Sequence, residues 1–221
     1  MESSDGNGEK EGLVYGASAK QGGAVSLELL HNGYEVYAVA RTEEQIEQLR
    51  AAGITAFRGD LNDTGSLYEA IQHVQIVYFQ LPVNFDLPLV RRYFQNAVDT
   101  AKLANVELLV VNTNVFVPKN LTDSDAIEIK RELKAYARDS GLPVIFLQPT
   151  LYLENLYIPG VFEENVLASP VPADHPIAWV SLKNAAKHAS YAIKSRFETK
   201  RHHKCPSQIN IKKRLKGTHL P

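Results

Sequence analysis

The sequence predicts an α/β protein with a doubly wound parallel sheet. Strand-like and helix-like segments alternate from residue 12 to about residue 150. Four of the six strand-like segments are continuous apolar runs, which is typical of strands buried on both faces. Alternating strands and helices form parallel sheets with right-handed crossovers. After residue 150 the periodicity weakens, and this part is expected to form a small, shortened C-terminal lobe over the carboxyl edge of the sheet.

Each strand-like segment is separated from the next by a helical segment with its own boundary signals. Thr42 and Gln45 have the spacing of a capping box, and Gly53 suits the residue that follows the same helix. The predicted strands are 13–15, 34–40, 54–60, 75–81, 106–113 and 143–150. The predicted helices are 22–32, 42–53, 63–74, 87–104, 124–141 and 181–193.

Composition divides the chain into four parts. Residues 1–11 are polar and are predicted to be a disordered leader. Residues 12–152 are predicted to form the main domain, and residues 153–194 a partial lobe that completes it. The last part, 195–221, is a basic tail without helical or strand periodicity, and it is also predicted to be disordered.

Composition also limits the compartment and the partners. The single cysteine excludes an intramolecular disulfide, and no segment approaches the run of about 18 apolar residues that a membrane span needs. A cytoplasmic protein is therefore expected, with nuclear entry through the basic tail left open. Nucleic acid is not expected as a partner, except through the charge of that tail. No metal site is predicted, because His202, His203 and Cys205 lie too close together on the tail to form a closed site.

The segment "GASAKQGG" (16–23) follows the first predicted strand and opens a helix. Gly16 suits a tight turn, and Gly22 allows the helix to approach it closely. Backbone N–H groups at such a helix start bind anions. Ala19 stands where the dinucleotide fingerprint usually has its middle glycine, and it fits only if its φ angle is negative. The segment therefore predicts a site for the pyrophosphate of a dinucleotide.

Several segments resemble, in the same order, the NmrA-like branch of the atypical short-chain dehydrogenase/reductases. They are "GASAKQGGAVSLELLHNGYEVYAVAR", "GDLND", "LP", "KRELKAYARDSGLPVIFLQPTLYLENL" and "IAWVSLKNAAKHA". The resemblance covers about residues 12–194. It implies that residues 12–152 form an NAD(P)-binding Rossmann domain.

The resemblance also implies a role for particular residues along the bound dinucleotide. Arg41 would face the adenosine ribose, where an arginine suits a 2′-phosphate, so NADP(H) is preferred over NAD(H) unless Glu43 turns inward. Lys130 would lie near the nicotinamide ribose, although an exposed helix lysine is an equal alternative. The pyrophosphate would lie among Gly16, Ser18, Lys20, Gln21 and Gly22, the adenine beside Asp60 and Leu61, and the nicotinamide path along Leu81 and Pro82.

The sequence departs from the wider enzyme group at the proton donor. Short-chain dehydrogenases usually carry a tyrosine four residues before a lysine, and none of the ten tyrosines here has a lysine at that position. Lys130 and Tyr136, six residues apart on one helix, are the remaining candidate catalytic residues. Gln148 stands where the family often has an arginine.

Three functions follow from these observations. The missing tyrosine–lysine pair and the short lobe favour a cofactor sensor that binds NADP(H) and acts through a protein partner. The alternative is an NADPH-dependent reductase of a small carbonyl, quinone or enone substrate, in which the cofactor supplies the chemistry. The third is an inactive variant with an incomplete lobe, which would expose apolar surface at the carboxyl edge. The sequence does not indicate the oligomeric state.

Overall fold

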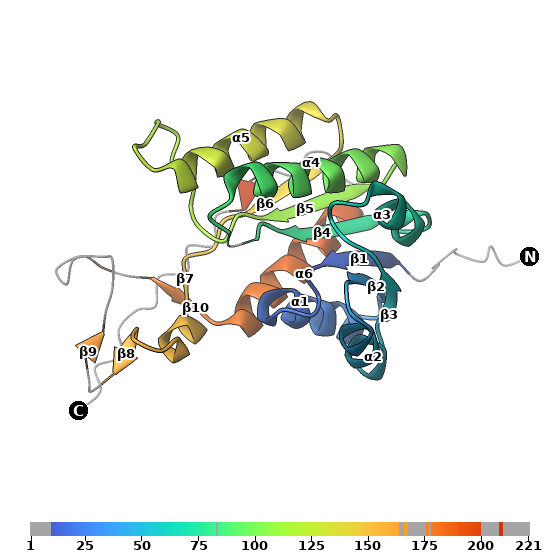
Figure 1. Ribbon diagram of the computed structural model, residues 1–221, viewed down its shortest axis with the longest axis horizontal. Helices are drawn as coiled ribbons and strands as arrows, with labels where there is room; N and C mark the ends of the chain where they lie inside the picture. Colours follow the sequence, from blue (N-terminus) through green and yellow to red (C-terminus); the bar gives the residue numbers. More distant parts are fainter. Residues whose placement is uncertain are drawn as a thin grey trace, which may run out of the picture.

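A computed structural model describes residues 10–82, 84–163, 166–167, 176, 178–199 and 208–209. Its main body has three layers, with a parallel sheet between two layers of helices (Figure 1). The doubly wound α/β fold predicted from the sequence is therefore confirmed. Within the described ranges, no helix combines the length and apolar composition that a membrane crossing needs.

The sheet has seven strands in the order β11-β6-β5-β4-β1-β2-β3. All of its neighbouring pairs are parallel. The strand order reverses between β1 and β4, so the crevice beyond the carboxyl ends of these two strands is the position where such sheets bind ligands. The strands are β1 (Glu11–Tyr15), β2 (Glu35–Ala40), β3 (Thr55–Arg58), β4 (Ile76–Gln80), β5 (Leu108–Asn112), β6 (Val144–Leu147) and β11 (Gln208–Ile209).

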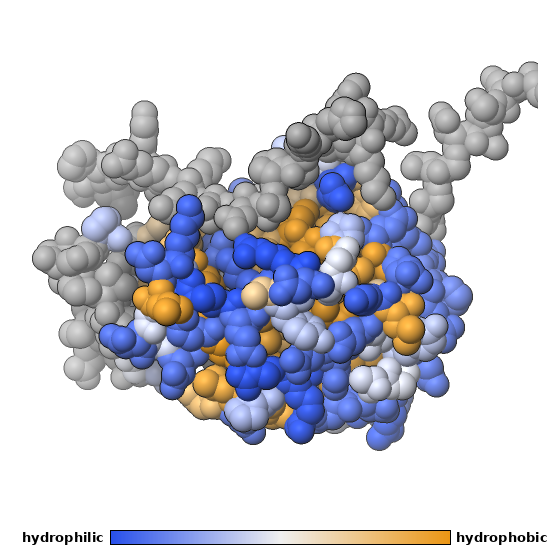
Figure 2. Space-filling view, turned by 90° about the horizontal axis from the view of Figure 1, so that it is seen from above, coloured by the Kyte–Doolittle hydropathy of each residue, from blue (hydrophilic) through white to orange (hydrophobic). Residues whose placement is uncertain are grey.

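The helices cover both faces of the sheet (Figure 1). Helices α1, α2 and α6 lie on one face, and α3, α4 and α5 lie on the other. Figure 2 looks onto the α4–α5 side, where hydrophilic residues dominate and hydrophobic ones form separate patches. The helices are α1 (Lys20–His31), α2 (Glu43–Ala51), α3 (Thr64–Ile71), α4 (Leu87–Leu103), α5 (Asp125–Asp139) and α6 (Leu182–Thr199).

Burial along the strands explains why some are apolar throughout and others alternate. The central strands β4 and β5 are buried at nearly every position, because helices cover both of their faces. Strands β2 and β3 lie toward one edge and contain exposed and half-buried positions. Apolar side chains from alternate strand positions form one hydrophobic core on each face of the sheet.

Local signals set the helix boundaries. The Thr42 hydroxyl accepts a hydrogen bond from the Gln45 backbone N–H at 3.3 Å, and Gly53 after this helix has φ +83°, so both predicted signals are confirmed. Asp63 and Asp86 cap α3 and α4 in the same way. Helix α1 begins at Lys20, two residues earlier than predicted.

The chain after β6 forms short elements that extend from the carboxyl edge of the sheet (Figure 1). β7 and β10 pair in parallel, with Leu151 opposite Trp179 and Tyr152 opposite Val180. Both carboxylate oxygens of Glu154 accept the Leu182 N–H at 3.0 Å, which ties this part to α6. The short elements are β7 (Leu151–Tyr152), the 3-10 helix η1 (Leu153–Tyr157), β8 (Phe162–Glu163), β9 (Val166–Leu167) and β10 (Trp179–Val180).

Both predicted end segments differ in part from the structure. β1 begins at Glu11, the last residue of the predicted leader. α6 continues to Thr199, and Gln208–Ile209 pairs with β6, so the prediction of a wholly disordered tail is wrong for these residues. A strand of two residues has no detectable periodicity of its own. Residues 1–9, 200–207 and 210–221, with the tail histidines and Cys205, lie outside the described residues.

Candidate functional site

The glycine turn joins β1 to α1 at the carboxyl edge. Gly16 has φ +77°, a conformation that favours glycine. A Cβ added to Gly22 would overlap the carbonyl oxygen of Gly16, so the close approach of helix and turn requires a glycine there. Ala19 has φ −95°, and its N–H donates to the Gly16 oxygen at 2.9 Å. The missing middle glycine is therefore accommodated without backbone strain.

The start of α1 is open to an anion. In the described chain, no side chain caps this helix and no acidic residue lies in its first turn. By contrast, α2 starts with a capping threonine and two glutamates. Uncapped N–H groups and the positive end of the helix dipole favour a negatively charged ligand. Lys20 and Ser18 are exposed beside them, so this end of the predicted pyrophosphate site has the necessary chemistry.

Arg41 follows β2 at the same edge of the sheet. Its side chain is exposed, and its backbone N–H donates to Gln45 Oε1 at 3.3 Å. Glu43 lies 3.8 Å from the Arg50 guanidinium on the same helix. Glu43 thus has a cation within reach on its own helix, and Arg41 has an exposed guanidinium at the end of β2.

The loop after β3 is fixed by hydrogen bonds. The Asp60 carboxylate accepts the Asn62 N–H at 2.7 Å, and the Asp60 N–H donates to the Ser66 hydroxyl at 3.2 Å. The carbonyl oxygen of Leu61 accepts a bond from the Asn96 side chain of α4 at 2.7 Å. Asp60 and Leu61 are thus held at the carboxyl edge by α3 and α4.

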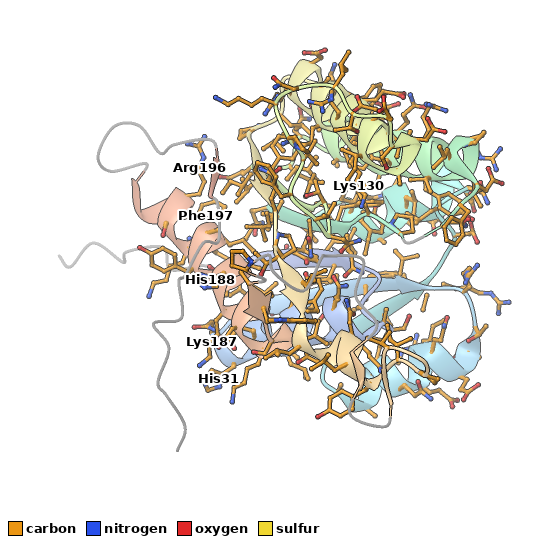
Figure 3. The ribbon with its side chains drawn as sticks, turned by 90° about the vertical axis from the view of Figure 1, so that its left-hand side faces the viewer. His31, Lys130, Lys187, His188, Arg196 and Phe197 are labelled. Atoms are coloured by element: carbon orange, nitrogen blue, oxygen red, sulfur yellow. The ribbon has the colours of Figure 1, made fainter. Side chains whose placement is uncertain are left out.

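Leu81, Pro82 and Lys130 come together in a pocket of about 340 Å³. The pocket lies between the first turns of α4 and α5, beyond the end of β4. Figure 3 shows Lys130 on the side of the sheet away from Lys187 and His188 of α6. Burial lowers the pKa of Lys130 from its ordinary value of 10.5. The other lining residues are Asn84, Phe85, Leu87, Val90, Asp125, Ala126 and Ile129.

A buried polar network lies between the glycine turn and the C-terminal lobe. The Asn112 amide nitrogen donates to the hydroxyl oxygens of Tyr78 at 3.0 Å and Tyr152 at 3.1 Å, and it lies 3.4 Å from Gln21 Oε1. Burial raises the pKa values of both tyrosines, so both are neutral at physiological pH. The network joins the end of β5 to β4, α1 and β7.

Three buried side-chain oxygens at the ends of β1, β4 and β5 lack a hydrogen-bond partner within the described structure, namely Tyr15 Oη, Gln80 Oε1 and Asn114 Oδ1. Gln80 ends β4, and Asn114 follows β5 with its amide nitrogen bonded to the Leu81 carbonyl. Buried acceptors without donors are unfavourable, and a ligand with N–H or O–H groups would satisfy them. Together with the glycine turn, they fit a dinucleotide with a polar head group.

Tyr136 lies apart from the Lys130 pocket. Its hydroxyl donates to Asp99 of α4 at 2.7 Å, and burial and this carboxylate raise the pKa of Tyr136 to about 12. The structure therefore does not bring Lys130 and Tyr136 into one site.

Gln148, which stands where the family often has an arginine, accepts hydrogen bonds from the Val117 N–H at 3.0 Å and from Lys134 Nζ at 3.1 Å.

The sequence did not single out Tyr78, Tyr152 and Gln80 as residues of this edge. Tyr78 and Gln80 belong to an apolar strand, where nothing in the local pattern distinguishes them from core residues. Tyr152 lies 40 positions from Asn112, and only the fold brings the two together. The one available signal was that Gln80 ends a strand at the edge where parallel sheets bind ligands.

A model of the NmrA-like family matches residues 9–209. A probable pinoresinol-lariciresinol reductase 3 of Arabidopsis thaliana is 24% identical over 72% of this chain and 52% of its own length. An NAD(P)H azoreductase of Xenophilus azovorans is 24% identical over 82% of this chain and 62% of its own. The chain thus spans less than two thirds of either curated relative.

Solved structures share the fold at low identity. A triphenylmethane reductase of Citrobacter sp. has a TM-score of 0.70 and 21% identity over 83% of this chain and 64% of its own. An NADPH-dependent quinone oxidoreductase of Escherichia coli, solved with NADPH, has a TM-score of 0.69 and 19% identity over 91% of this chain and 78% of its own. The family match extends from the first described strand to the last, and this chain belongs to the NmrA-like family.

Proposed function

We propose that this protein is an NADPH-dependent reductase of a small carbonyl, quinone or enone substrate. The observation that carries the proposal is Lys130 in the apolar pocket with Leu81 and Pro82, at the same sheet edge as the glycine turn. Members of the family named as reductases support it, since the two curated relatives both carry that name. They favour a reductase over the sensor expected from the missing tyrosine–lysine pair.

The cofactor would lie along the carboxyl edge. The turn residues Gly16, Ser18, Lys20, Gln21 and Gly22 would bind its pyrophosphate. Asp60 and Leu61 would lie beside the adenine, and Leu81 and Pro82 would line the way to the nicotinamide. When bound, the nicotinamide group supplies a hydride to the substrate.

Arg41 would determine the preference for NADP(H) over NAD(H). A guanidinium group binds a 2′-phosphate through two parallel charged hydrogen bonds, which a ribose hydroxyl cannot match. The ion pair of Glu43 with Arg50 supports this assignment, because Glu43 is the residue that would favour NAD(H) if its carboxylate turned inward.

Lys130 would hold the substrate oxygen and donate a proton to it. Lys130 is half-buried in a pocket lined mainly by apolar residues, where a charged hydrogen bond to a substrate oxygen is stronger than in water. Burial lowers the pKa of Lys130, which makes proton donation easier than from an exposed lysine. Tyr136 is not proposed as a donor, because its hydroxyl is bonded to Asp99 outside this pocket.

The test is a steady-state assay of NADPH oxidation with a panel of quinones, enones and small aldehydes. Turnover that Lys130→Met lowers, with NADPH affinity by calorimetry unchanged, supports the proposal. Lys187→Met is the matched control, since Lys187 is an exposed lysine on α6 at the other face of the sheet (Figure 3). NADPH binding without turnover of any substrate in the panel would contradict a reductase and favour the cofactor sensor instead.

A further inference from the structure

A second pocket lies beside α5, and its lining carries positive charge. It has a volume of about 390 Å³ and is formed by α5, the loop after β5 and the residue that follows β6. It shares no lining residue with the Lys130 pocket. Its lining residues, none of which is acidic among those described, are Phe116, Val117, Pro118, Lys119, Arg131, Lys134, Arg138 and Gln148.

Lys134 is the buried charge of this pocket, with only 7% of its surface exposed. Its Nζ donates one hydrogen bond, to Gln148 Oε1 at 3.1 Å, and a lysine ammonium has three N–H groups. Nζ also lies 5.3 Å from the centre of the Phe146 ring. In the described part of the chain, no carboxylate is paired with Lys134. A buried ammonium group usually has such a partner.

Neighbouring cations increase the cost of this burial. Arg138 lies over the same Phe146 ring at 5.2 Å, and Arg131 and Lys119 complete the lining. Burial and repulsion from Arg138 and Arg131 lower the pKa of Lys134. Of the four cations that line this pocket, only Arg131 has an acidic partner among the described residues, namely Glu128 at 2.8 Å. The pocket therefore holds more positive charge than its own acids balance.

The wall of the pocket is held in place before any ligand binds. The Arg131 guanidinium donates to the carbonyl oxygens of Pro118, Lys119 and Asn120, which fixes the loop after β5. Gln148 Oε1 accepts both the Val117 N–H and Lys134 Nζ, so the loop, α5 and the end of β6 share one acceptor. Because the donors and the buried cation are already in place, an anion can bind without ordering new side chains, which lowers the free-energy cost of binding.

We propose that this pocket binds a compact tetrahedral oxyanion, phosphate or a small phosphorylated molecule, at a site separate from the dinucleotide. Lys134 and Arg138 provide the charged hydrogen bonds, and Lys119 lies at the exposed rim. The site lies beyond β6, whereas Arg41 and the glycine turn follow β2 and β1, on the other side of β4 in the sheet. The two anion sites can therefore be filled together.

Titration calorimetry of the full chain with inorganic phosphate, at ionic strength held constant with chloride, tests the proposal. We expect saturable binding that Lys134→Met and Arg138→Gln each weaken about tenfold or more. Lys134→Met keeps a long apolar side chain in the pocket and leaves the hydrogen bond from the Val117 N–H to Gln148. Because the substitution removes a buried charge that has no acidic partner, it should not destabilise the fold. A thermal unfolding curve for each variant verifies that it is folded. Lys187→Met should bind phosphate as the parent does.

Four results would overturn the proposal. The first is no saturable heat with phosphate at concentrations up to tens of millimolar. The second is phosphate binding that survives Lys134→Met unchanged. The third is phosphate binding that saturating NADPH abolishes in a protein that binds NADPH, because the ion would then occupy the dinucleotide site. Succinate serves as the comparison anion, and binding of succinate in preference to phosphate would assign the pocket to carboxylates instead.

Discussion

The two halves of the sheet form their parts of the candidate site in different ways. In the β1–β3 half, the site consists mainly of backbone: a glycine turn, an uncapped helix start and a loop tied by its own N–H groups. In the β4–β6 half, it consists of side chains, with Asn112 bonded to two tyrosines and Lys130 in an apolar pocket. The first half has the chemistry to bind phosphate groups, and the second has the chemistry to act on a substrate.

This difference predicts that substitutions in the two halves have different kinetic effects. Changes in the β1–β3 half should alter cofactor affinity, because the backbone there meets a part of the ligand that does not react. Changes in the β4–β6 half should alter turnover, because the proposed proton donor, Lys130, lies there. The predictions below test this division, starting with the largest effect.

Lys130→Met should lower kcat by about a hundredfold to ten-thousandfold, the usual contribution of a positioned proton donor. NADPH affinity should change little if Lys130 meets the substrate oxygen, as proposed above. Single-turnover kinetics with a quinone substrate and calorimetry with NADPH measure the two effects. Normal kcat with weakened NADPH binding would show that Lys130 contacts only the cofactor. The two halves of the sheet would then not differ in their kinetic roles.

The pH dependence of kcat should report Lys130. A donor must be protonated, so kcat should fall as pH rises through the pKa of Lys130. Because burial lowers that pKa, the fall should occur below the ordinary value of 10.5. The measurement is kcat at pH values from about 6 to about 10, a range in which a lysine with a lowered pKa titrates. In Lys130→Met this alkaline fall should be absent, and its persistence there would point to another group.

Gly22→Ala should weaken NADPH binding by about tenfold or more, the effect of losing a charged hydrogen bond to the pyrophosphate. The added Cβ overlaps the Gly16 carbonyl, so helix and turn must separate. Calorimetry measures the loss. Gly12→Ala is the matched control, since a Cβ there would meet its nearest neighbours at an ordinary 3.9 Å. Unchanged binding in Gly22→Ala would show that the turn is not the phosphate site.

Arg41→Ala should lower NADPH affinity by about tenfold to a hundredfold and leave NADH affinity unchanged. The guanidinium contributes only to a ligand with a 2′-phosphate, so the ratio of the two dissociation constants is the measurement. Equal losses for NADPH and NADH would mean that Arg41 contacts the shared part of the dinucleotide.

Ala19→Gly should have the smallest effect. Ala19 already has a negative φ, so glycine relieves no strain, and its greater freedom in the unfolded chain costs about 0.5–1 kcal/mol of stability. Dinucleotide affinity should change by less than about threefold. A large gain in affinity would mean that the alanine methyl group obstructs the pyrophosphate.

The sequence predicted the features that depend on local chemistry. Apolar runs predicted the central strands, and Thr42 and Gly53 predicted the ends of α2, because capping acts within one turn. The Asn112 network and the Lys134–Gln148 bond were not predicted, because they join residues from separate elements. β11 was missed because its two residues gain their strand conformation from pairing with β6. Lys130 was placed by family resemblance, and only the fold gave its pocket.

The pairing of β7 with β10 gives the protein an optical reporter. Trp179 is the single tryptophan of the chain, and it lies opposite Leu151, next to the residue whose hydroxyl bonds Asn112. Tryptophan emission therefore originates from the junction between the C-terminal lobe and the carboxyl edge, without contribution from the rest of the sheet. Excitation of this indole would transfer energy to a reduced nicotinamide bound at that edge. The rate at which Trp179 fluorescence is quenched would thus measure the rate at which the cofactor binds next to the C-terminal lobe.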